Sequence, residues 1–409
     1  MGDVLSRIAA CIAGTCFFYL GTFKLLGAYQ QCGYRGGRFV RWLKRKDNLF
    51  YNRLALWAGL SLLSSALFAL VFSFAGTDAA LLLSAVPFFF FCVLFCIADR
   101  KYALKVPVAV TGRIKRLSAV YILLIACASY IVVALLGFFA ELADNRLYDL
   151  FAYLPFSLMP LLLPWLLVSA GALDGLYEEP RNRKYVKRAG QVLSERKILR
   201  IAVVGSYGKT SVKNILESIL SRRFRTVVTP ESYNTPMGVA RTVLGADFEG
   251  KEAFIAEMGA RKEGDIAELC ALVKPDYAVF TGVCAQHIQT FGSEENVLKA
   301  KCEILKGTSK KVICGGGLKE KILPLSPETV SLSDKEKCVY ADFGELLSDL
   351  GLRADGTSFT LRLPGRNPIS VHTCLLGAHS AENIALAALL AAELGLTDAE
   401  IADGIAGIT

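Results

Sequence analysis

Residues 201–211 hold the strongest structural signal in the chain. They read Ile201-Ala202-Val203-Val204-Gly205-Ser206-Tyr207-Gly208-Lys209-Thr210-Ser211. The apolar run predicts a buried strand, and the two glycines that follow it predict a tight turn. Beyond the turn, apolar residues recur every three or four positions, which predicts a helix with one buried face. These residues are Val212, Ile215, Leu216, Ile219 and Leu220.

A strand, a glycine loop and a Lys-Thr pair opening a helix form the setting of a phosphate-binding loop. Glycines let backbone N–H groups converge on phosphate oxygens, and the helix N-terminus adds the positive end of its dipole. Lys209 could then reach the β and γ phosphates of ATP, and the Thr210 hydroxyl could ligate Mg²⁺. Because Val203 stands where the full motif has its first glycine, a glycine-rich turn before an ordinary helix remains the alternative. The candidate nucleotide-binding residues in the loop are Gly205, Ser206, Tyr207, Gly208, Lys209, Thr210 and Ser211.

Short apolar runs alternate with amphipathic segments after the loop. This alternation predicts an α/β domain over residues 198–409, with an open, mostly parallel sheet and helices on both faces. Ligands of such sheets gather at the carboxyl ends of the strands, where Glu257 ends one strand and His287 follows another. Each of these two could equally be a surface or capping residue. The expected strands span residues 253–257, 277–281 and 312–314, and the expected helices span 266–273 and 296–305.

The first 173 residues have the composition of a membrane domain. Four apolar runs each approach the roughly 20 residues that a helix needs to cross a bilayer, and a shorter fifth run precedes them. Basic loops alternate with connectors that together hold a single base, Arg146, and several acids, which places the N-terminus outside and everything after residue 173 in the cytoplasm. We therefore expect a multi-span α-helical domain in a bacterial cytoplasmic membrane. The runs cover residues 8–23, 54–75, 79–98, 119–140 and 150–173.

Charge is distributed unevenly along the chain. The first 170 residues carry 16 basic and 7 acidic side chains, which accounts for the whole net charge of +9, and the remainder carries 30 of each. A nucleic-acid partner is not expected, because the excess bases lie among the most apolar segments. The basic loops would set topology and contact anionic lipid headgroups. A second interpretation is that residues 105–116 help bind an anionic, lipid-linked substrate.

Residues 174–197 form a basic juxtamembrane linker, and residues 174–200 carry eight Lys or Arg side chains. We expect a helix here that lies near the headgroups, although its bases could simply be a solvated face. The 12 cysteines form neither a CxxC pair nor a cluster with zinc spacing. In a cytoplasmic domain they are expected to stay reduced and mostly buried.

Five ordered motifs in residues 198–409 resemble the central domain of the Mur ligases, ATP-dependent amide-forming enzymes of peptidoglycan precursor synthesis. The phosphate loop is the first of the five, and the third and fourth are most similar to MurF, the member that adds D-alanyl-D-alanine. The other four are Asn234-Thr235-Pro236-Met237-Gly238-Val239; Glu257-Met258-Gly259-Ala260, continuing through Gly264-Asp265-Ile266-Ala267 to Lys274-Pro275-Asp276; His287, continuing through Phe291-Gly292-Ser293 to Lys299-Ala300-Lys301-Cys302-Glu303-Ile304; and Gly377-Ala378-His379-Ser380-Ala381-Glu382-Asn383.

The resemblance implies a mechanism in which ATP converts a substrate carboxylate to an acyl phosphate, which an amine then attacks to give an amide, ADP and phosphate. Such chemistry mainly requires that groups are positioned and charge is neutralised. By this resemblance Lys209 holds the β and γ phosphates, while Thr210 and Glu257 hold a first Mg²⁺. His287 serves a second Mg²⁺, and Lys301 matches a lysine that becomes carbamylated.

Two further roles follow from the resemblance. Asn234 would contact the γ-phosphate or acyl group, and Asn383 would recognise adenine. Each residue also has an ordinary interpretation: Asn234 as a turn residue, Asn383 as a member of the first turn of a helix, and Lys301 as a solvated helix lysine.

The chain departs from the family pattern at both ends of the matching region. A membrane domain stands where the family has its UDP-binding domain, so the cell-wall precursor could be nucleotide-linked or lipid-linked. The sequence ends near the close of the central domain, so a separate chain could supply the family's third domain, which binds the incoming amino acid or dipeptide. Two alternatives to a ligase acting in the cell-wall pathway remain. One is a catalytically incomplete ATP-binding membrane protein that scaffolds or regulates cell-wall synthesis, and the other is a ligase for another polymer such as poly-γ-glutamate.

Overall fold

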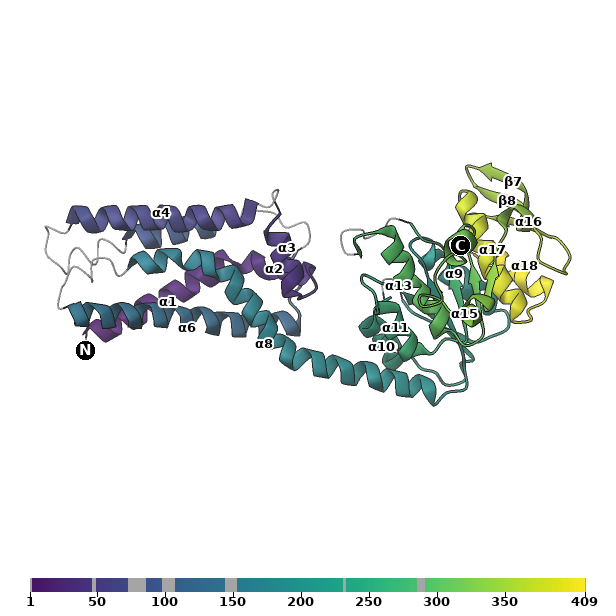
Figure 1. Cartoon of the computed structure of the whole chain (residues 1–409), viewed down its shortest axis with the longest axis horizontal. Coiled ribbons are helices and arrows are strands. Elements are labelled where there is room, and N and C mark those ends of the chain that lie inside the picture. Colours follow the sequence, from purple (N-terminus) through teal and green to yellow (C-terminus); the bar gives the residue numbers. More distant parts are fainter. Residues whose placement is uncertain are drawn as a thin grey trace. The chain divides into compact units, whose positions relative to one another are not determined.

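The computed structural model describes residues 2–45, 49–72, 86–97, 107–143, 153–230, 233–284 and 291–408. The chain divides into two compact units, Met1–Pro180 and Arg181–Thr409. Figure 1 shows helices in the first unit and mixed helices and strands in the second. Each unit is described by itself below.

The described part of the first unit is helical and has its own apolar core, which includes Phe18, Tyr121 and Leu163. Two helices, Gly112–Leu135 and Phe156–Ser194, are long and apolar enough to cross a membrane. A third span is possible if Cys11–Gly21 and Phe23–Gln31, which meet at a 44° bend, act as one. The helices are α1 (Gly2–Gly21), α2 (Phe23–Gln31), α3 (Gly36–Leu43), α4 (Leu49–Phe72), Val86–Ile97, α6 (Gly112–Ala143) and α8 (Tyr153–Ser194).

Two arginines at the start of α6 form ion pairs with acidic residues of α8 inside this unit. Arg113 Nε lies 2.9 Å from Asp174 Oδ2, and Arg116 pairs with Glu178. The Arg113 guanidinium also stacks over the Tyr34 ring, 4.0 Å from its centroid. Both carboxylates are buried, and a buried carboxylate needs such a partner. These two arginines of segment 105–116 therefore already have protein partners.

A six-stranded parallel sheet forms the centre of the second unit, and its strand order is β2-β3-β1-β4-β5-β6. This confirms the mostly parallel sheet expected from the sequence. β1 and β3 are neighbours, and their register places Val203 beside Glu257, so the turn after β1 and the end of β3 lie at the same edge. The strands are β1 (Leu199–Val204), β2 (Thr226–Val228), β3 (Ala253–Met258), β4 (Tyr277–Phe280), β5 (Lys311–Cys314) and β6 (Cys338–Tyr340).

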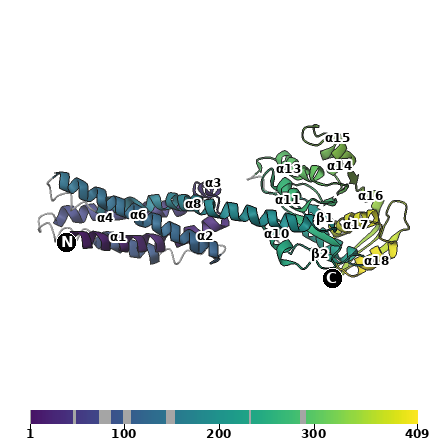
Figure 2. The ribbon, with the colours of Figure 1, turned by 90° about the horizontal axis from the view of Figure 1, so that it is seen from below.

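Helices cover both faces of this sheet (Figure 2). One core holds side chains from the end of α8 and from α10, α11 and α13, and the other holds side chains from α9, α17 and α18. This is the layered arrangement typical of parallel sheets buried on both faces. The helices are α9 (Lys209–Leu220), α10 (Pro236–Gly245), α11 (Asp265–Val273), α13 (Glu294–Gly307), α14 (Leu318–Ile322), α15 (Leu332–Glu336), α16 (Phe343–Leu346), α17 (Ala378–Glu393) and α18 (Asp398–Ala406).

A small antiparallel sheet, for which the sequence analysis made no prediction, packs on the α9 and α17 side. It consists of β7 (Leu347–Arg353), β8 (Gly356–Leu361) and β9 (Ile369–Thr373) in that order. Phe359 and Val371 from these strands belong to the same core as α9.

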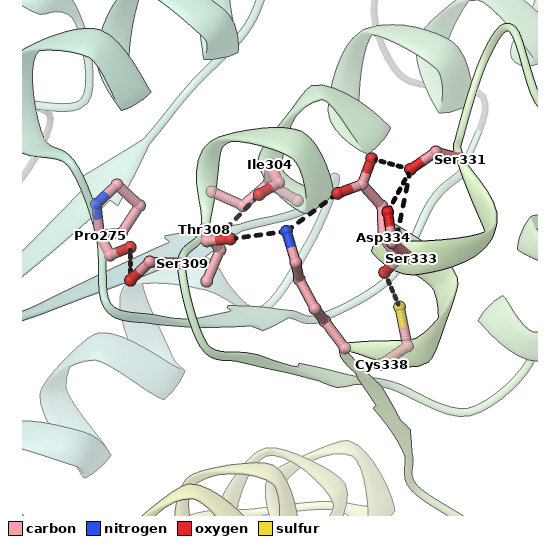
Figure 3. Close-up of polar contacts among 9 residues, drawn as sticks. Pro275, Ile304, Thr308, Ser309, Ser331, Ser333, Asp334 and Cys338 are labelled. Carbon is pink, nitrogen blue, oxygen red and sulfur yellow. Dashed lines mark hydrogen bonds and ion pairs between the residues drawn. The ribbon is translucent and has the colours of Figure 1, made fainter.

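The connection that leads into β6 is fixed by a polar cluster around Asp334 (Figure 3). The Ser331 hydroxyl, which caps α15, donates to Asp334 Oδ2 at 2.6 Å. Lys337 Nζ lies 2.9 Å from Asp334 Oδ1 and donates to the Thr308 carbonyl at 3.1 Å. These bonds tie β6 to the end of α13, on a part of the unit away from the phosphate loop.

Candidate nucleotide-binding site

The loop between β1 and α9 adopts a conformation that suits a bound phosphate chain. Gly208 has φ of 71°, a left-handed conformation that glycine adopts readily, and it stands just before the first residue of α9. A side chain at Gly205 would collide with the Thr281 hydroxyl, so the loop can approach β4 only with glycine there. Within the described part of the chain, no side-chain hydrogen bond from the N-cap position caps α9, because that position is Gly208. The N-terminus of this helix is therefore suited to an anion.

Two lysines lie close to this loop. Lys209 Nζ is 3.4 Å from the Ser206 carbonyl oxygen, and the buried Lys301 Nζ donates to the Gly205 carbonyl at 2.7 Å. Burial lowers the pKa of Lys209. Burial, and secondarily the positive charge of Lys209, lowers the pKa of Lys301 to about 8. A substantial fraction of Lys301 is thus a neutral amine near neutral pH, which is unusual for lysine.

The Glu257 side chain receives a hydrogen bond at each carboxylate oxygen. Thr210 Oγ1 donates to Glu257 Oε2 at 2.8 Å, and Asn234 Nδ2 donates to Glu257 Oε1 at 3.0 Å. Glu257 is 3% exposed. Three elements therefore bring a hydroxyl, an amide and a carboxylate together beside the loop: the start of α9, the segment before α10 and the end of β3.

This donor set fits Mg²⁺. Magnesium in nucleotide sites is held by one or two protein oxygens together with phosphate oxygens and water. Among the described residues no group of three or more His, Cys, Asp or Glu side chains is arranged so that it could hold a metal ion. Thr210 and Glu257 would be the protein ligands, and their oxygens already lie within hydrogen-bonding distance of each other.

Asn383, which the sequence analysis expects to recognise adenine, lies on α17. A Cβ atom placed on Gly208 would lie 2.7 Å from Asn383 Oδ1, so the Asn383 side chain lies directly against the loop. Ser206 is buried, whereas Tyr207 and Ser211 are exposed.

The structure thus brings Lys209, Thr210, Asn234, Glu257, Lys301 and Asn383 to one edge of the sheet. His287, the candidate ligand of a second Mg²⁺, lies outside the described residues. Two buried polar residues that the sequence analysis did not single out, Lys213 and Thr229, lie directly behind Glu257 and are taken up below.

Comparison with known proteins assigns a family to this region. Residues 203–392 match the family model described as the Mur ligase middle domain. The UDP-N-acetylmuramoyl-tripeptide--D-alanyl-D-alanine ligase of Bacillus subtilis (strain 168) is 30% identical over 214 residues, which cover 51% of this chain and 44% of that protein. The ligase of the same name from Escherichia coli (strain K12) is 32% identical over 213 residues, which cover 51% of this chain and 46% of that protein. The chain thus spans somewhat less than half the length of these curated relatives.

A solved structure shares the fold of this region. The crystal structure of MurF from Acinetobacter baumannii is similar with a TM-score of 0.51 and 23% identity, over 56% of this chain and 50% of that chain. At this identity the similarity supports the fold alone.

Proposed function

We propose, from the match of residues 203–392 to the Mur ligase middle domain and from the similar ligases, that this chain takes part in an ATP-dependent, amide-forming reaction of MurF type on a peptidoglycan precursor. The observation that carries the proposal is the meeting of Lys209, Thr210 and Glu257 at the loop between β1 and α9. A carboxylate substrate is already a nucleophile, so the protein has chiefly to position groups and neutralise charge.

Each residue of the candidate site has a part in this proposal. Lys209 and the N-terminus of α9 would neutralise the phosphate oxygens, and Thr210 with Glu257 would hold Mg²⁺. Magnesium, when bound, supplies positive charge to the phosphates. Asn234 would orient a phosphoryl or acyl oxygen, and Asn383 would bind the base.

Lys301 has the properties that carbamylation requires. Only a neutral amine adds CO₂, and the buried Lys301 has a pKa of about 8. Its nitrogen also lies 2.7 Å from the Gly205 carbonyl, inside the loop region. A carbamate there would carry negative charge next to a bound cation, where an ammonium group would repel it.

We further propose that the first unit anchors this domain in the bacterial cytoplasmic membrane as a multi-span domain, with the domain facing the cytoplasm. The apolar helices of that unit and the alternation of basic and non-basic loops support the proposal. The precursor would be nucleotide-linked, like the UDP-N-acetylmuramoyl-tripeptide in the names of the relatives, or lipid-linked.

Release of ADP tests both parts of the proposal. Inverted membrane vesicles containing the full chain are supplied with ATP and Mg²⁺, and with UDP-N-acetylmuramoyl-tripeptide and D-alanyl-D-alanine, alone and together. A C-terminal segment of the Bacillus relative is added in parallel samples. We expect release that requires both substrates, and release from inverted but not from sealed right-side-out vesicles.

Other results would point elsewhere. A scaffolding or regulatory protein would be favoured if the chain bound nucleotide but released no ADP in any sample, including those with the added segment. Release that requires a different amine, such as glutamate in a panel of amines, would favour ligation onto another polymer.

A further inference from the structure

Lys213 is a buried cation on the inner face of α9. It is 3% exposed and lies one helical turn after Lys209. Its Nζ donates a hydrogen bond of 2.8 Å to the Thr229 carbonyl oxygen, just beyond the end of β2. Removing a charge from water is costly, so a buried lysine needs a hydrogen-bond acceptor such as this carbonyl.

Thr229 links this lysine to the strand that carries Glu257. The Thr229 hydroxyl accepts a hydrogen bond of 2.9 Å from the Glu257 backbone N–H, and the Thr229 N–H donates to the Ile255 carbonyl at 3.0 Å. Thr229 is 1% exposed, so water cannot replace these bonds. The Thr229 side chain therefore holds the backbone at Glu257, and Lys213 holds the backbone of the same threonine.

The chain of hydrogen bonds continues into the candidate metal site. Glu257 binds Thr210 and Asn234 through its carboxylate, and the Asn234 carbonyl accepts from the Gly259 N–H at 2.8 Å. Neither Lys213 nor Thr229 is a ligand in this arrangement. Thr229 lies one hydrogen bond from the Glu257 backbone N–H and Lys213 lies two, so they help to determine where that backbone sits.

We propose that Lys213 and Thr229 are positioning residues that set the Mg²⁺ affinity of the site formed by Thr210 and Glu257. The inference rests on the proposed function, because it requires that Mg²⁺-nucleotide binds there. Its physical basis is that outer partners of a metal ligand fix the ligand's orientation and commonly change metal affinity by about 10–100-fold when removed.

The test measures the Mg²⁺ concentration that gives half-maximal binding of a fluorescent ATP analogue to the full chain in detergent. Thr229→Val removes the hydroxyl at nearly constant shape and is expected to raise that concentration about 10-fold. Thr229→Ser keeps the hydroxyl and is expected to behave like the parent protein. Lys213→Met keeps the length of the side chain, removes the charge and is also expected to raise the concentration about 10-fold.

A second readout separates positioning from general stability. Lys213→Met leaves the buried Thr229 carbonyl oxygen without its donor, so a lower melting temperature than that of the parent protein is expected. Binding by this variant is therefore measured well below its own melting temperature, where the folded variant is still expected to show the raised Mg²⁺ requirement. A residue that serves only the fold would show a changed melting temperature with an unchanged Mg²⁺ requirement.

The outcomes separate this inference from the proposed function. If the parent protein shows no Mg²⁺-dependent nucleotide binding, the proposed function fails. If the parent binds and Thr229→Val has the same Mg²⁺ requirement as Thr229→Ser, the inference is wrong. Should Lys213→Met fail to fold, the two Thr229 variants decide alone.

Discussion

Replacing Lys209 with alanine is expected to reduce the affinity for Mg²⁺-ATP by about 100-fold or more, which corresponds to the loss of a charge-assisted hydrogen bond to phosphate. Lys209 begins α9, and its ammonium group lies at the loop, 3.4 Å from the Ser206 carbonyl oxygen. The variant removes an already desolvated cation, so its effect on folding should be small.

Isothermal titration of the full chain in detergent measures this loss. Lys310→Ala is the matched control, because Lys310 is exposed just before the start of β5, at the sheet edge opposite the loop that follows β1. Unchanged binding by Lys209→Ala, with the control also unchanged, would show that the nucleotide is bound elsewhere.

Lys301→Ala is expected to leave nucleotide binding nearly intact and to reduce turnover by about 1,000-fold, the order found when a group that acts on transition-state charge is removed. Lys301 Nζ donates to the Gly205 carbonyl and does not lie at the start of α9. The lowered pKa of Lys301 suits a carbamate. The effect should therefore fall on the chemical step rather than on affinity.

Single-turnover ADP formation and equilibrium binding, measured on the same preparation, test this split. Lys299→Ala provides the control, since Lys299 lies on the same helix and pairs with Glu295 at the surface. If Lys301→Ala retained turnover, the carbamate assignment would be wrong. If Lys301→Ala lost nucleotide binding as well, Lys301 would be one of the residues that bind the nucleotide.

The sequence pattern around the phosphate-binding loop was sufficient to predict the strand before it and the helix after it. The apolar run before Gly205 and the helical spacing from Val212 onward depend on neighbouring residues alone, and both elements are present as β1 and α9. The strands expected at 253–257, 277–281 and 312–314 correspond to β3, β4 and β5 within one residue at each end.

Elements with weak local signals were not predicted. β2 and β6 have three residues each, too short for a periodic pattern. β9 alternates between buried and exposed residues, from Ile369 to Thr373, which is a usable strand signal. Its pairing with β8, and the packing of both on the α9 side, depend on contacts that are distant in sequence.

The sequence predicted the residues of the candidate site individually. It did not predict the hydrogen bonds between them. Family resemblance indicated Glu257 and Asn234 separately, but not that one binds the other. Lys213 carried a signal that could have been used: it falls between Val212 and Leu216, on the apolar face of a helix. A lysine at such a position needs a buried acceptor, which only the fold identifies as the Thr229 carbonyl.

Photolabelling with 8-azido-ATP, followed by mass spectrometry of the labelled peptides, tests most directly that the turn between β1 and α9 binds the nucleotide. The azide is on the adenine ring, and Asn383 on α17 lies against Gly208. We expect Mg²⁺-dependent label in peptides containing residues 205–211 or 378–383, blocked by excess ATP and absent from Lys209→Ala. ATP-protected label confined to other peptides, or equal label in Lys209→Ala, would contradict this assignment.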